Sequence, residues 1–354
     1  MEKHYAVGVM SGTSLDGIDV AYCTFTKNDN KWSFSIEKAH TYVYSNEWKS
    51  KLKLAHKLPA AEFLKLHNDY GEYLGIMIKD FIRKIYTKVD IIASHGHTIF
   101  HQPEENFTFQ LGEGTRIASI TGLPTVSDFR TWDIALGGQG APLVPVGDKY
   151  LFSDYDFCLN LGGFANISLD IEENRSAFDI CPVNFVLNRL ITEFGFDFDK
   201  NGEIGKKGKI DQSLLQELNA LEFYHKIPPK SLSREWVEMN IYPLLMKYSV
   251  SLYDKLRTIY EHIAIQIYLT INNFKGENLF VTGGGAYNKF LIELFKKYLS
   301  QKIVIPENVI IDYKEALIFA FLGVLKIRKE INCFKSVTGA KSDSVVGVLH
   351  DPQE

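Results

Sequence analysis

The segment from Gly12 to Asp19, Gly-Thr-Ser-Leu-Asp-Gly-Ile-Asp, combines glycines with hydroxyl and carboxylate side chains. Glycine lets backbone N–H groups approach an anion closely, and the hydroxyls add further donors. Asp16 or Asp19 could hold Mg²⁺, directly or through water, because hard cations prefer oxygen ligands. The pattern therefore suits a phosphate site, although a plain hairpin turn is slightly favoured on composition alone. The P-loop pattern is absent from this segment.

Two further glycine-rich turns offer the same kind of chemistry. Gly162-Gly163 lies within Asn160–Asn166 and could form a second phosphate-facing turn, although paired glycines are common in ordinary turns. Gly283-Gly284-Gly285 precedes Asn288 and a predicted helix, so a flat ligand such as adenine could lie against its backbone. One glycine usually suffices for a tight strand-to-helix turn, and three therefore favour a ligand moderately.

A single carboxylate, Asp179, is placed for acid–base chemistry. It follows the apolar run 176–178 and precedes Ile180. A carboxylate at a strand end can take a proton from a bound reactant. A turn or helix-cap aspartate is the commoner structural explanation for a lone Asp.

Two polar clusters could contact a sugar. Ser94-His95-Gly96-His97 lacks a third ligand at the spacing of a metal site, so hydrogen bonding to a polyhydroxylated ligand is the more plausible role. In the cluster from Asp128 to Asp133, Arg130 could clamp a substrate carboxylate through two parallel hydrogen bonds, and Trp132 could stack on a sugar face. A buried ion pair explains the second cluster equally well.

The elements that must position these residues follow a repeated plan. The apolar runs 5–10 and 18–25 flank the first glycine turn and predict a β-hairpin, with a third strand over 32–40. A helical apolar stripe over 70–85 follows. Strand, glycine turn and strand then recur over 157–171, so the two halves of the chain echo each other in structure without a literal sequence repeat.

Composition narrows the function classes. The 354 residues suffice for two domains, which we expect at 1–148 and 149–354, with the last segment free to pack back on the first domain. A net charge of −4 offers no basic surplus for nucleic acid, and no apolar run reaches the roughly 20 residues of a membrane span. The start of the chain shows no signal-peptide pattern, and 4 scattered Cys predict neither a disulfide framework nor a zinc site. We therefore expect a cytoplasmic protein.

The motifs taken together resemble the anhydro-N-acetylmuramic acid kinases, a family of bacterial cell-wall recycling enzymes. The matching segments, which span nearly the whole chain in order, are 8–19, 94–103, 118–122, 126–145, 160–167, 282–288, 315–316 and 337–340. The most specific among them are Gly12–Asp19 and Gly137–Pro145.

The resemblance implies an α/β fold with two domains like those of actin, Hsp70 and sugar kinases, a mixed sheet in each domain and a central nucleotide cleft. It implies that ATP, Mg²⁺ and water are used to open the 1,6-anhydro ring of the sugar and phosphorylate its 6-oxygen, with Asp179 as the catalytic residue. The implied cofactor-binding residues are Gly12, Thr13, Ser14, Leu15, Asp16, Gly17, Ile18, Asp19, Gly162, Gly163, Gly283, Gly284, Gly285 and Asn288, with Asp16 and Asp19 at the metal. The implied substrate residues are His95, Gly96, His97, Asp128, Arg130, Asp133 and Glu315.

The sequence departs from the family pattern at two places. Around Asp179, Ile180, Cys181 and Val183 replace the usual Thr and two Gly, and His97 stands where Gln is usual. A related sugar kinase without ring opening, and a non-catalytic ATP-binding protein of the same fold, therefore stay open as alternatives. The expected partners are an amino sugar and ATP, and a homodimer is left open.

Overall fold

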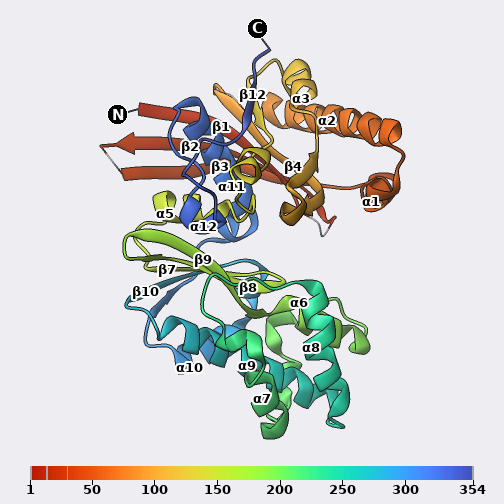
Figure 1. Ribbon diagram of the computed structural model, residues 1–354, viewed down its shortest axis with the longest axis vertical. Coiled ribbons are helices and arrows are strands. Elements are labelled where there is room, and N and C mark those ends of the chain that lie inside the picture. The colour runs from red at the N-terminus through yellow and green to blue at the C-terminus, as the bar shows by residue number, and fades with distance from the viewer. Residues whose placement is uncertain (1, 13–14, 30, 86, 353–354) are drawn as a thin grey trace. The chain divides into compact units, whose positions relative to one another are not determined.

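The computed structural model describes residues 2–12, 15–29, 31–85 and 87–352 (Figure 1). The chain divides into two units. The first combines Met1–Leu151 with Tyr313–Glu354, and the second is Phe152–Asp312. The residues from 313 onward, which the sequence-based division counted with the second domain but left free to pack back on the first, belong to the first unit.

The sheet of the first unit mixes antiparallel and parallel pairs. Its strands are β1 (Glu2–Ser11), β2 (Gly17–Asn28), β3 (Lys31–Val43), β4 (Ile91–Gln102), β5 (Phe107–Leu111), β6 (Thr125–Ser127) and β12 (Val348–His350). The order is β12-β6-β4-β1-β2-β3, and β5 pairs with β4. Strands β1, β2 and β3 form an antiparallel meander, while β4 lies parallel to β1 and β6 parallel to β4.

The sheet of the second unit repeats this plan. Its strands are β7 (Phe157–Leu161), β8 (Phe164–Ile171), β9 (Asn174–Pro182), β10 (Asn278–Thr282) and β11 (Lys302–Val304). The order is β11-β10-β7-β8-β9, again an antiparallel meander extended by parallel strands on the side of its first strand. The expected α/β class with a mixed sheet in each of two parts, and the expected structural echo, are both confirmed.

Helices cover both faces of the first sheet. Successive residues of its strands point to opposite faces, so apolar side chains meet helices on each side. The helices assigned to this unit, or reaching it in the case of α11, are α1 (Asn46–Leu54), α2 (Ala60–Arg83), α3 (Gly114–Thr121), α4 (Thr131–Ala135), α5 (Val144–Leu151), α11 (Asn308–Ile327) and α12 (Lys335–Thr338). Val7 and Val9 join the apolar cluster of α2, which confirms the predicted helical stripe. On the other face, a Cβ at Gly8 would lie 1.8 Å from the Ala316 carbonyl oxygen, so the glycine allows α11 to pack directly on β1.

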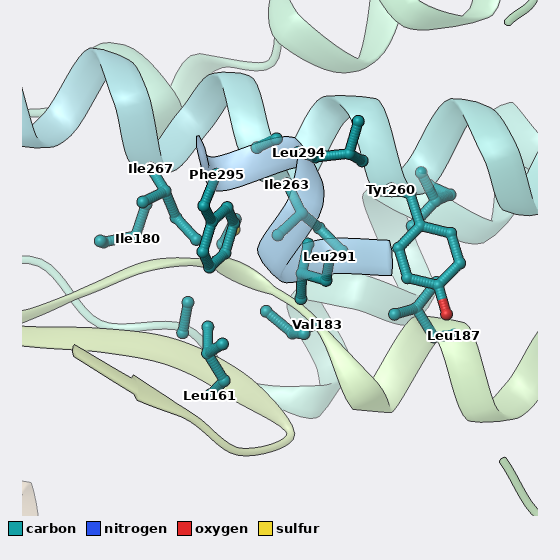
Figure 2. Close-up of a cluster of buried hydrophobic side chains, with 14 of the residues drawn as sticks. Leu161, Ile180, Val183, Leu187, Tyr260, Ile263, Ile267, Leu291, Leu294 and Phe295 are labelled. Carbon is teal, nitrogen blue, oxygen red and sulfur yellow. The ribbon is translucent and has the colours of Figure 1, made fainter. Parts of the chain in front are cut away.

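A continuous apolar core fills the second unit (Figure 2). Its helices are α6 (Asn184–Ile191), α7 (Gln212–Asn219), α8 (Arg234–Lys247), α9 (Leu252–Ile271) and α10 (Lys289–Tyr298). The α9 residues Ile263 and Ile267 and the α10 residue Phe295 pack with Leu161 of β7, and all of them are nearly inaccessible to solvent. The second unit therefore has its own core, with α9 at its centre.

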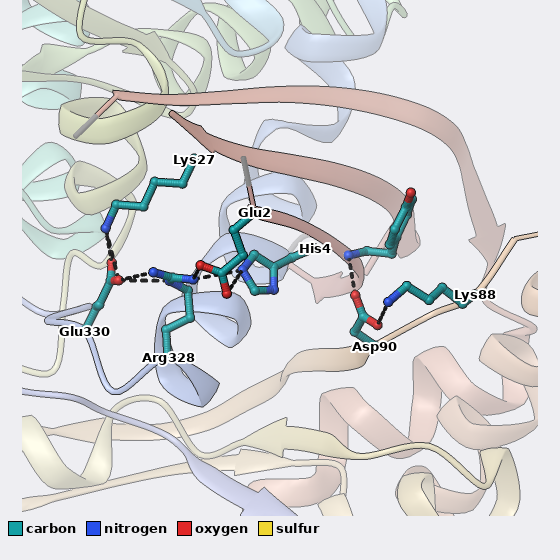
Figure 3. A network of polar contacts seen from close by, with 8 residues as sticks. Glu2, His4, Lys27, Lys88, Asp90, Arg328 and Glu330 are labelled. Carbon is teal, nitrogen blue, oxygen red and sulfur yellow. Dashed lines mark hydrogen bonds and ion pairs between the residues drawn. The ribbon is translucent and has the colours of Figure 1, made fainter. Parts of the chain in front are cut away.

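An ion-pair network ties the end of α11 to the start of the first sheet (Figure 3). Arg328 pairs with Glu2 and with Glu330, and Glu330 also accepts a hydrogen bond from Lys27 at 2.9 Å. Because these ion pairs are partly exposed to solvent, each contributes little to stability. The four cysteines are buried free thiols. Across the described residues, no helix combines the length and the hydropathy needed to cross a membrane.

Candidate active site

The first glycine-rich segment is the turn of a β-hairpin, as predicted. The Gly12 carbonyl accepts a hydrogen bond from the Leu15 N–H at 3.3 Å, and Leu15 has a left-handed φ of 61°. Gly17 begins β2 so close to β3 that a Cβ would lie 2.7 Å from the Tyr42 carbonyl oxygen. Ile18 is fully buried in the sheet, so its side chain serves packing. Thr13 and Ser14 lie outside the described residues.

The two carboxylates of this hairpin differ in environment. Asp16 is exposed, whereas Asp19 is partly buried and its Oδ1 accepts a hydrogen bond from the Thr41 hydroxyl at 2.6 Å. Two oxygen-donating carboxylates suit Mg²⁺, which usually keeps several water ligands. No group of three or more His, Cys, Asp or Glu side chains able to hold a metal occurs within the described ranges. Asp16 and Asp19 therefore match Mg²⁺ only in the chemistry of their oxygen donors.

A pair formed by buried His95 and partly buried Arg130 lies at the end of the parallel strands of the first sheet. Strand β4 continues through the polar residues to Gln102 and carries His95 into the interior. Arg130 donates to His95 Nε2 from Nε at 3.0 Å and from Nη2 at 2.9 Å, and from Nη1 to the Gly140 carbonyl at 2.7 Å. Burial and the neighbouring guanidinium hold the pKa of His95 well below its usual range, so His95 is neutral and accepts.

Glu315 belongs to the same neighbourhood, on α11. Its side chain is solvent-accessible yet crowded by protein, and this desolvation raises its pKa, while the positive charge of Arg130 acts in the opposite direction. Desolvation also lowers the pKa of Arg130 to about 10, which leaves the guanidinium charged at neutral pH. Arg130, His95 and Glu315 therefore combine a fixed cation, a neutral imidazole and a carboxyl group.

Asp133 is placed differently from the expected substrate contact. It is fully buried, and it accepts hydrogen bonds from the Thr338 hydroxyl at 2.7 Å, the Cys333 thiol at 3.2 Å and the Gly140 N–H at 2.8 Å. With both oxygens occupied by protein donors, Asp133 positions the loop around Gly140, whose carbonyl in turn holds Arg130. Its role in the structure is to support the site, and direct contact with a sugar does not fit its burial.

Three other predicted sugar-site residues are also bound within the protein. Asp128 accepts a hydrogen bond from the Thr131 N–H at 3.3 Å at the start of α4. Gly96 has a φ of 73°, and a Cβ there would lie 2.3 Å from the Leu111 carbonyl oxygen, so β5 requires glycine at this position. His97 bonds to Ser11 at 2.8 Å, and burial lowers its pKa to about 4.

Sequence reasoning missed the hydrogen-bond network to which His97 belongs. Ser11 also bonds to the Tyr44 hydroxyl at 2.7 Å, and Tyr44 bonds to Tyr70. Ser11 ends β1, Tyr44 follows β3, Tyr70 lies in α2 and His97 lies in β4, so only the fold brings them together. Ser11, the last residue of β1, connects this hydrogen-bond network to the residue before Gly12.

In the second unit, the Gly162-Gly163 turn faces the start of α6. The carbonyl of Gly163 accepts from the N–H groups of Val183 at 2.8 Å and Phe185 at 3.1 Å, and the carbonyl of Gly162 accepts from the Asn184 N–H at 3.3 Å. A Cβ at Gly163 would meet its nearest neighbour only at 3.8 Å. Tight packing therefore does not demand glycine at 163, which leaves room for a ligand to approach the backbone.

The three glycines after β10 divide into two kinds. Gly283 has a φ of 79°, and Cβ atoms at Gly283 and Gly285 would lie 2.6 Å from Asn160 Oδ1 and from Leu161 Cβ, respectively. At Gly284 the nearest atom would be Asn184 Nδ2 at 3.9 Å. Packing therefore explains two of the glycines, and Gly284 is the one with open space in front of it.

Asn288 has a structural role in the described contacts. Its Oδ1 caps α10 by accepting from the Leu291 N–H at 3.1 Å, and its Nδ2 donates to the Tyr260 hydroxyl at 2.7 Å. Tyr260 in turn donates to Asp199 at 3.1 Å. Asn288 thus holds the end of the glycine turn to α9.

Asp179 lies inside β9, three residues before the strand ends at Pro182, and not at the strand end as predicted. It stands beside a β-bulge, since Asn166 pairs with Asp179 and Ala165 with Cys181, which leaves Ile180 as the extra residue. Its Oδ2 accepts a hydrogen bond from the Leu232 N–H at 2.8 Å. Burial raises the pKa of Asp179, and the Leu232 hydrogen bond lowers it.

The residues that depart from the family pattern are absorbed by the core. Ile180, Cys181 and Val183 are each no more than 1% exposed, and Figure 2 shows Ile180 and Val183 among the apolar side chains of α9 and α10. Their larger side chains therefore fill the interior, while Asp179 keeps a partly open position.

A hollow of about 670 Å³ adjoins the segment that contacts Asp179, and nothing in the sequence pattern indicated it. It is lined by Phe223, His225, Lys226, Ile227, Pro229, Lys230, Ser231 and Trp236. A run containing Pro228-Pro229 predicts only a break in the chain.

Comparisons with known proteins place the chain in a family. The model of the family described as anhydro-N-acetylmuramic acid kinase matches residues 4–352. Proteins of that name from Sulfurimonas denitrificans and Mannheimia succiniciproducens are 33% and 35% identical to it, with 99% of this chain covered in both cases and 100% and 99% of the relatives. A solved ROK family glucokinase from Streptomyces griseus, in complex with glucose and AMPPNP, aligns at a TM-score of 0.41 and 9% identity over 90% of this chain and 99% of that one. By the family match and the full-length relatives, this chain belongs to the anhydro-N-acetylmuramic acid kinase family.

Proposed function

We propose that this protein is a kinase that opens the 1,6-anhydro ring of anhydro-N-acetylmuramic acid with water and phosphorylates the released 6-oxygen at the expense of ATP. The product is N-acetylmuramic acid 6-phosphate, an intermediate of peptidoglycan recycling. The observation that carries this proposal is the full-length match to relatives of that name, at 33–35% identity.

Each unit offers glycine backbone that suits a nucleotide. The β1–β2 hairpin, Gly162-Gly163 and Gly284 offer glycine backbone for phosphate and adenine, and the space in front of Gly163 and Gly284 fits this role. Asp16 and Asp19 would hold Mg²⁺, directly or through water. When bound, ATP supplies the phosphoryl group and Mg²⁺ neutralises its charge.

The sugar is assigned to the polar cluster of the first unit. Arg130 carries a permanent positive charge that suits the lactyl carboxylate of the substrate. Neutral His95 fixes the guanidinium by accepting two of its hydrogen bonds, so Arg130 does not have to be ordered when the sugar binds. Glu315 is the accessible carboxyl of the cluster and suits the sugar hydroxyls.

Asp179 is assigned the role of general base. Oδ2 is held by the Leu232 N–H, and among the described residues Oδ1 has no hydrogen-bond partner. Oδ1 takes the proton of a water molecule as the water oxygen bonds to the anomeric carbon and the bond from that carbon to the 6-oxygen breaks. The 6-oxygen then accepts the phosphoryl group, so no separate proton donor is needed for it.

The Asp179→Asn variant tests this assignment. General base catalysis is worth about 10²–10⁴-fold, so turnover with anhydro-N-acetylmuramic acid should fall by at least about 100-fold while ATP still binds. ADP release measures turnover, and product mass identifies the sugar phosphate. Asp170→Asn, the same change on the neighbouring strand β8, is the control and should keep its activity. Near-normal turnover of Asp179→Asn would remove Asp179 from this role.

Isotope labelling separates ring opening from the alternatives. In ¹⁸O-labelled water the label should enter the anomeric hydroxyl of the product. Label only in phosphate would indicate ATP hydrolysis. A kinase without ring opening would phosphorylate a reducing sugar and ignore the anhydro form, and a non-catalytic ATP-binding protein would release no ADP with either.

A further inference from the structure

The segment 222–232, which precedes α8, forms hydrogen bonds with Asp179 at two points. The N–H of Asp179 donates to the Lys230 carbonyl at 3.0 Å, and its Oδ2 accepts from the Leu232 N–H at 2.8 Å. Backbone and carboxylate are therefore both held by residues about fifty positions further along the chain. The orientation of the carboxylate depends on where this segment, 222–232, is fixed.

The first anchor of the segment is a buried hydrogen bond from Tyr224 to α9. His262 Nδ1 lies 2.7 Å from Asn219 Oδ1, and Gln266 Nε2 donates to the same oxygen at 2.9 Å. Because that oxygen can only accept, His262 carries its proton on Nδ1 and accepts from the Tyr224 hydroxyl through Nε2 at 2.9 Å. Burial lowers the pKa of His262 to about 3, so this tautomer persists at neutral pH.

The second anchor joins the far end of the segment to its beginning. The Lys230 Nζ donates to the Phe223 carbonyl at 3.3 Å and lies 4.8 Å from the centre of the Phe223 ring. Phe223 is only 4% exposed and packs on Trp236 of α8, with ring centres 5.3 Å apart. The ammonium group therefore ties the residues that contact Asp179 to the part of the segment fixed in the core.

We infer that Tyr224 and Lys230 are positioning residues for Asp179: through the Leu232 N–H they hold Oδ2 and so direct Oδ1 toward the reacting water. The inference rests on the proposed function only for the identity of the reaction, since the contacts themselves lie within the second unit. Residues that hold a catalytic group in place act through geometry, and a displacement of about 1 Å can be costly.

The same geometry sets the expected pH dependence. The Leu232 N–H stabilises the charged carboxylate. Among the described residues, the Cys181 thiol on the same strand is near both Asp179 and the Lys230 ammonium. Burial raises the pKa of Cys181 above the working range, so it stays neutral. Loosening the segment should weaken the Leu232 hydrogen bond and move the pKa of Asp179 upward.

Two variants, each with one anchor removed, test the inference. Tyr224→Phe keeps the ring and deletes the hydroxyl, and Lys230→Met keeps the aliphatic stem and deletes the ammonium. In each, the acidic limb of the kcat profile should move up by roughly one pH unit, about the effect of one charge-assisted hydrogen bond. At neutral pH kcat should fall about tenfold with little change in KM for ATP. Tyr248→Phe, which deletes a hydroxyl bonded to Glu217 in the same unit, is the matched control and should leave the acidic limb in place.

A readout without substrate separates this inference from the proposed function. The pKa of Asp179 is followed by carboxyl ¹³C NMR in the whole protein, with Asp179→Asn used to assign the signal. An upward shift in both variants supports positioning even if the sugar is not a substrate. An unchanged Asp179 pKa in folded Tyr224→Phe and Lys230→Met overturns the inference, whatever the activity. If one variant does not fold, the other decides.

Discussion

The sheets of the two units share a five-strand order, to which the first adds β5 and β12, but the side chains at their candidate sites differ. In the first unit, polar side chains bond to each other: Arg130 to His95, and Asp133 to Thr338. In the second unit, the candidate site consists mainly of glycine backbone and one carboxylate, Asp179, held by a backbone N–H. A shared topology therefore fixes where site residues stand in a sheet but leaves open which chemistry they perform.

The difference also separates two kinds of support. The first unit stabilises its site with buried side-chain networks, whose loss leaves unsatisfied partners and costs stability. In the second unit, other groups approach the glycine backbone closely. An added methyl group there would disturb either the packing of the protein or the binding of a ligand. Substitutions in the polar network of the first unit should therefore lower the free energy of unfolding. Substitutions at the glycines of the second unit should affect either the free energy of unfolding or ligand binding.

The largest effect is expected at Asp133. Asp133→Ala leaves the Gly140 N–H, the Thr338 hydroxyl and the Cys333 thiol without their acceptor in the interior. Since each unsatisfied buried donor costs about 1–3 kcal/mol, the free energy of unfolding in urea should fall by at least about 3 kcal/mol. Asp128→Ala, at the start of the same helix, removes a single hydrogen bond and should cost about 1 kcal/mol. Equal losses in the two variants would contradict the structural role of Asp133.

The sequence predicted the strands and glycine turns well because their signals are local. Apolar runs bounded by glycine indicate β1, β2, β7 and β8, and the structure confirms them. It could not predict the partners of Asp133, since Cys333 and Thr338 lie about two hundred residues away. The burial of a polar residue depends on tertiary packing, which no local pattern encodes.

The same limit applies to Asp179. Its position after an apolar run suggested a strand end. The bulge at Ile180 and the hydrogen bond from the Leu232 N–H form only when β8, β9 and the segment 222–232 come together. The glycine run Gly283–Gly285 indicated a ligand as a whole, whereas the structure assigns two of its members to packing. Sequence reasoning therefore found the residues, and the structure divides them by role.

The second effect concerns acid stability, because each unit buries a histidine of low pKa. Burial lowers the pKa of His97 to about 4 and that of His262 to about 3. The unfolded chain protonates these groups near pH 6.5, so stability is complete above that pH and falls as the pH drops toward the folded-state values. Each group should cost about 1.4 kcal/mol per pH unit in this range.

His97→Gln isolates the share of His97. The variant should lose stability less steeply between pH 6.5 and 4, by roughly 3 kcal/mol in total, while the contributions of His95 and His262 remain. Urea unfolding at a series of pH values measures the slope. The exposed His225→Gln is the control and should keep the wild-type slope. An unchanged slope in His97→Gln would mean that His97 is not held neutral by its burial.

The smallest effect on stability is expected from two alanine substitutions in the turn Gly283–Gly285 of the second unit. These two variants should also separate a loss of stability from a loss of nucleotide binding most clearly. Gly285→Ala places a methyl group 2.6 Å from Leu161 Cβ and should cost about 1–3 kcal/mol of stability through overpacking. Gly284→Ala meets its nearest neighbour at 3.9 Å and should leave the free energy of unfolding within about 0.5 kcal/mol of wild type. If nucleotide lies against this backbone, Gly284→Ala should instead raise the KM for ATP several-fold, because the methyl group occupies the space of the ligand.

Urea unfolding and nucleotide titration on both proteins separate the outcomes. A Gly284→Ala protein with normal stability and normal ATP binding would leave the turn with a packing role only, and the contrast between the units would then rest on Asp179.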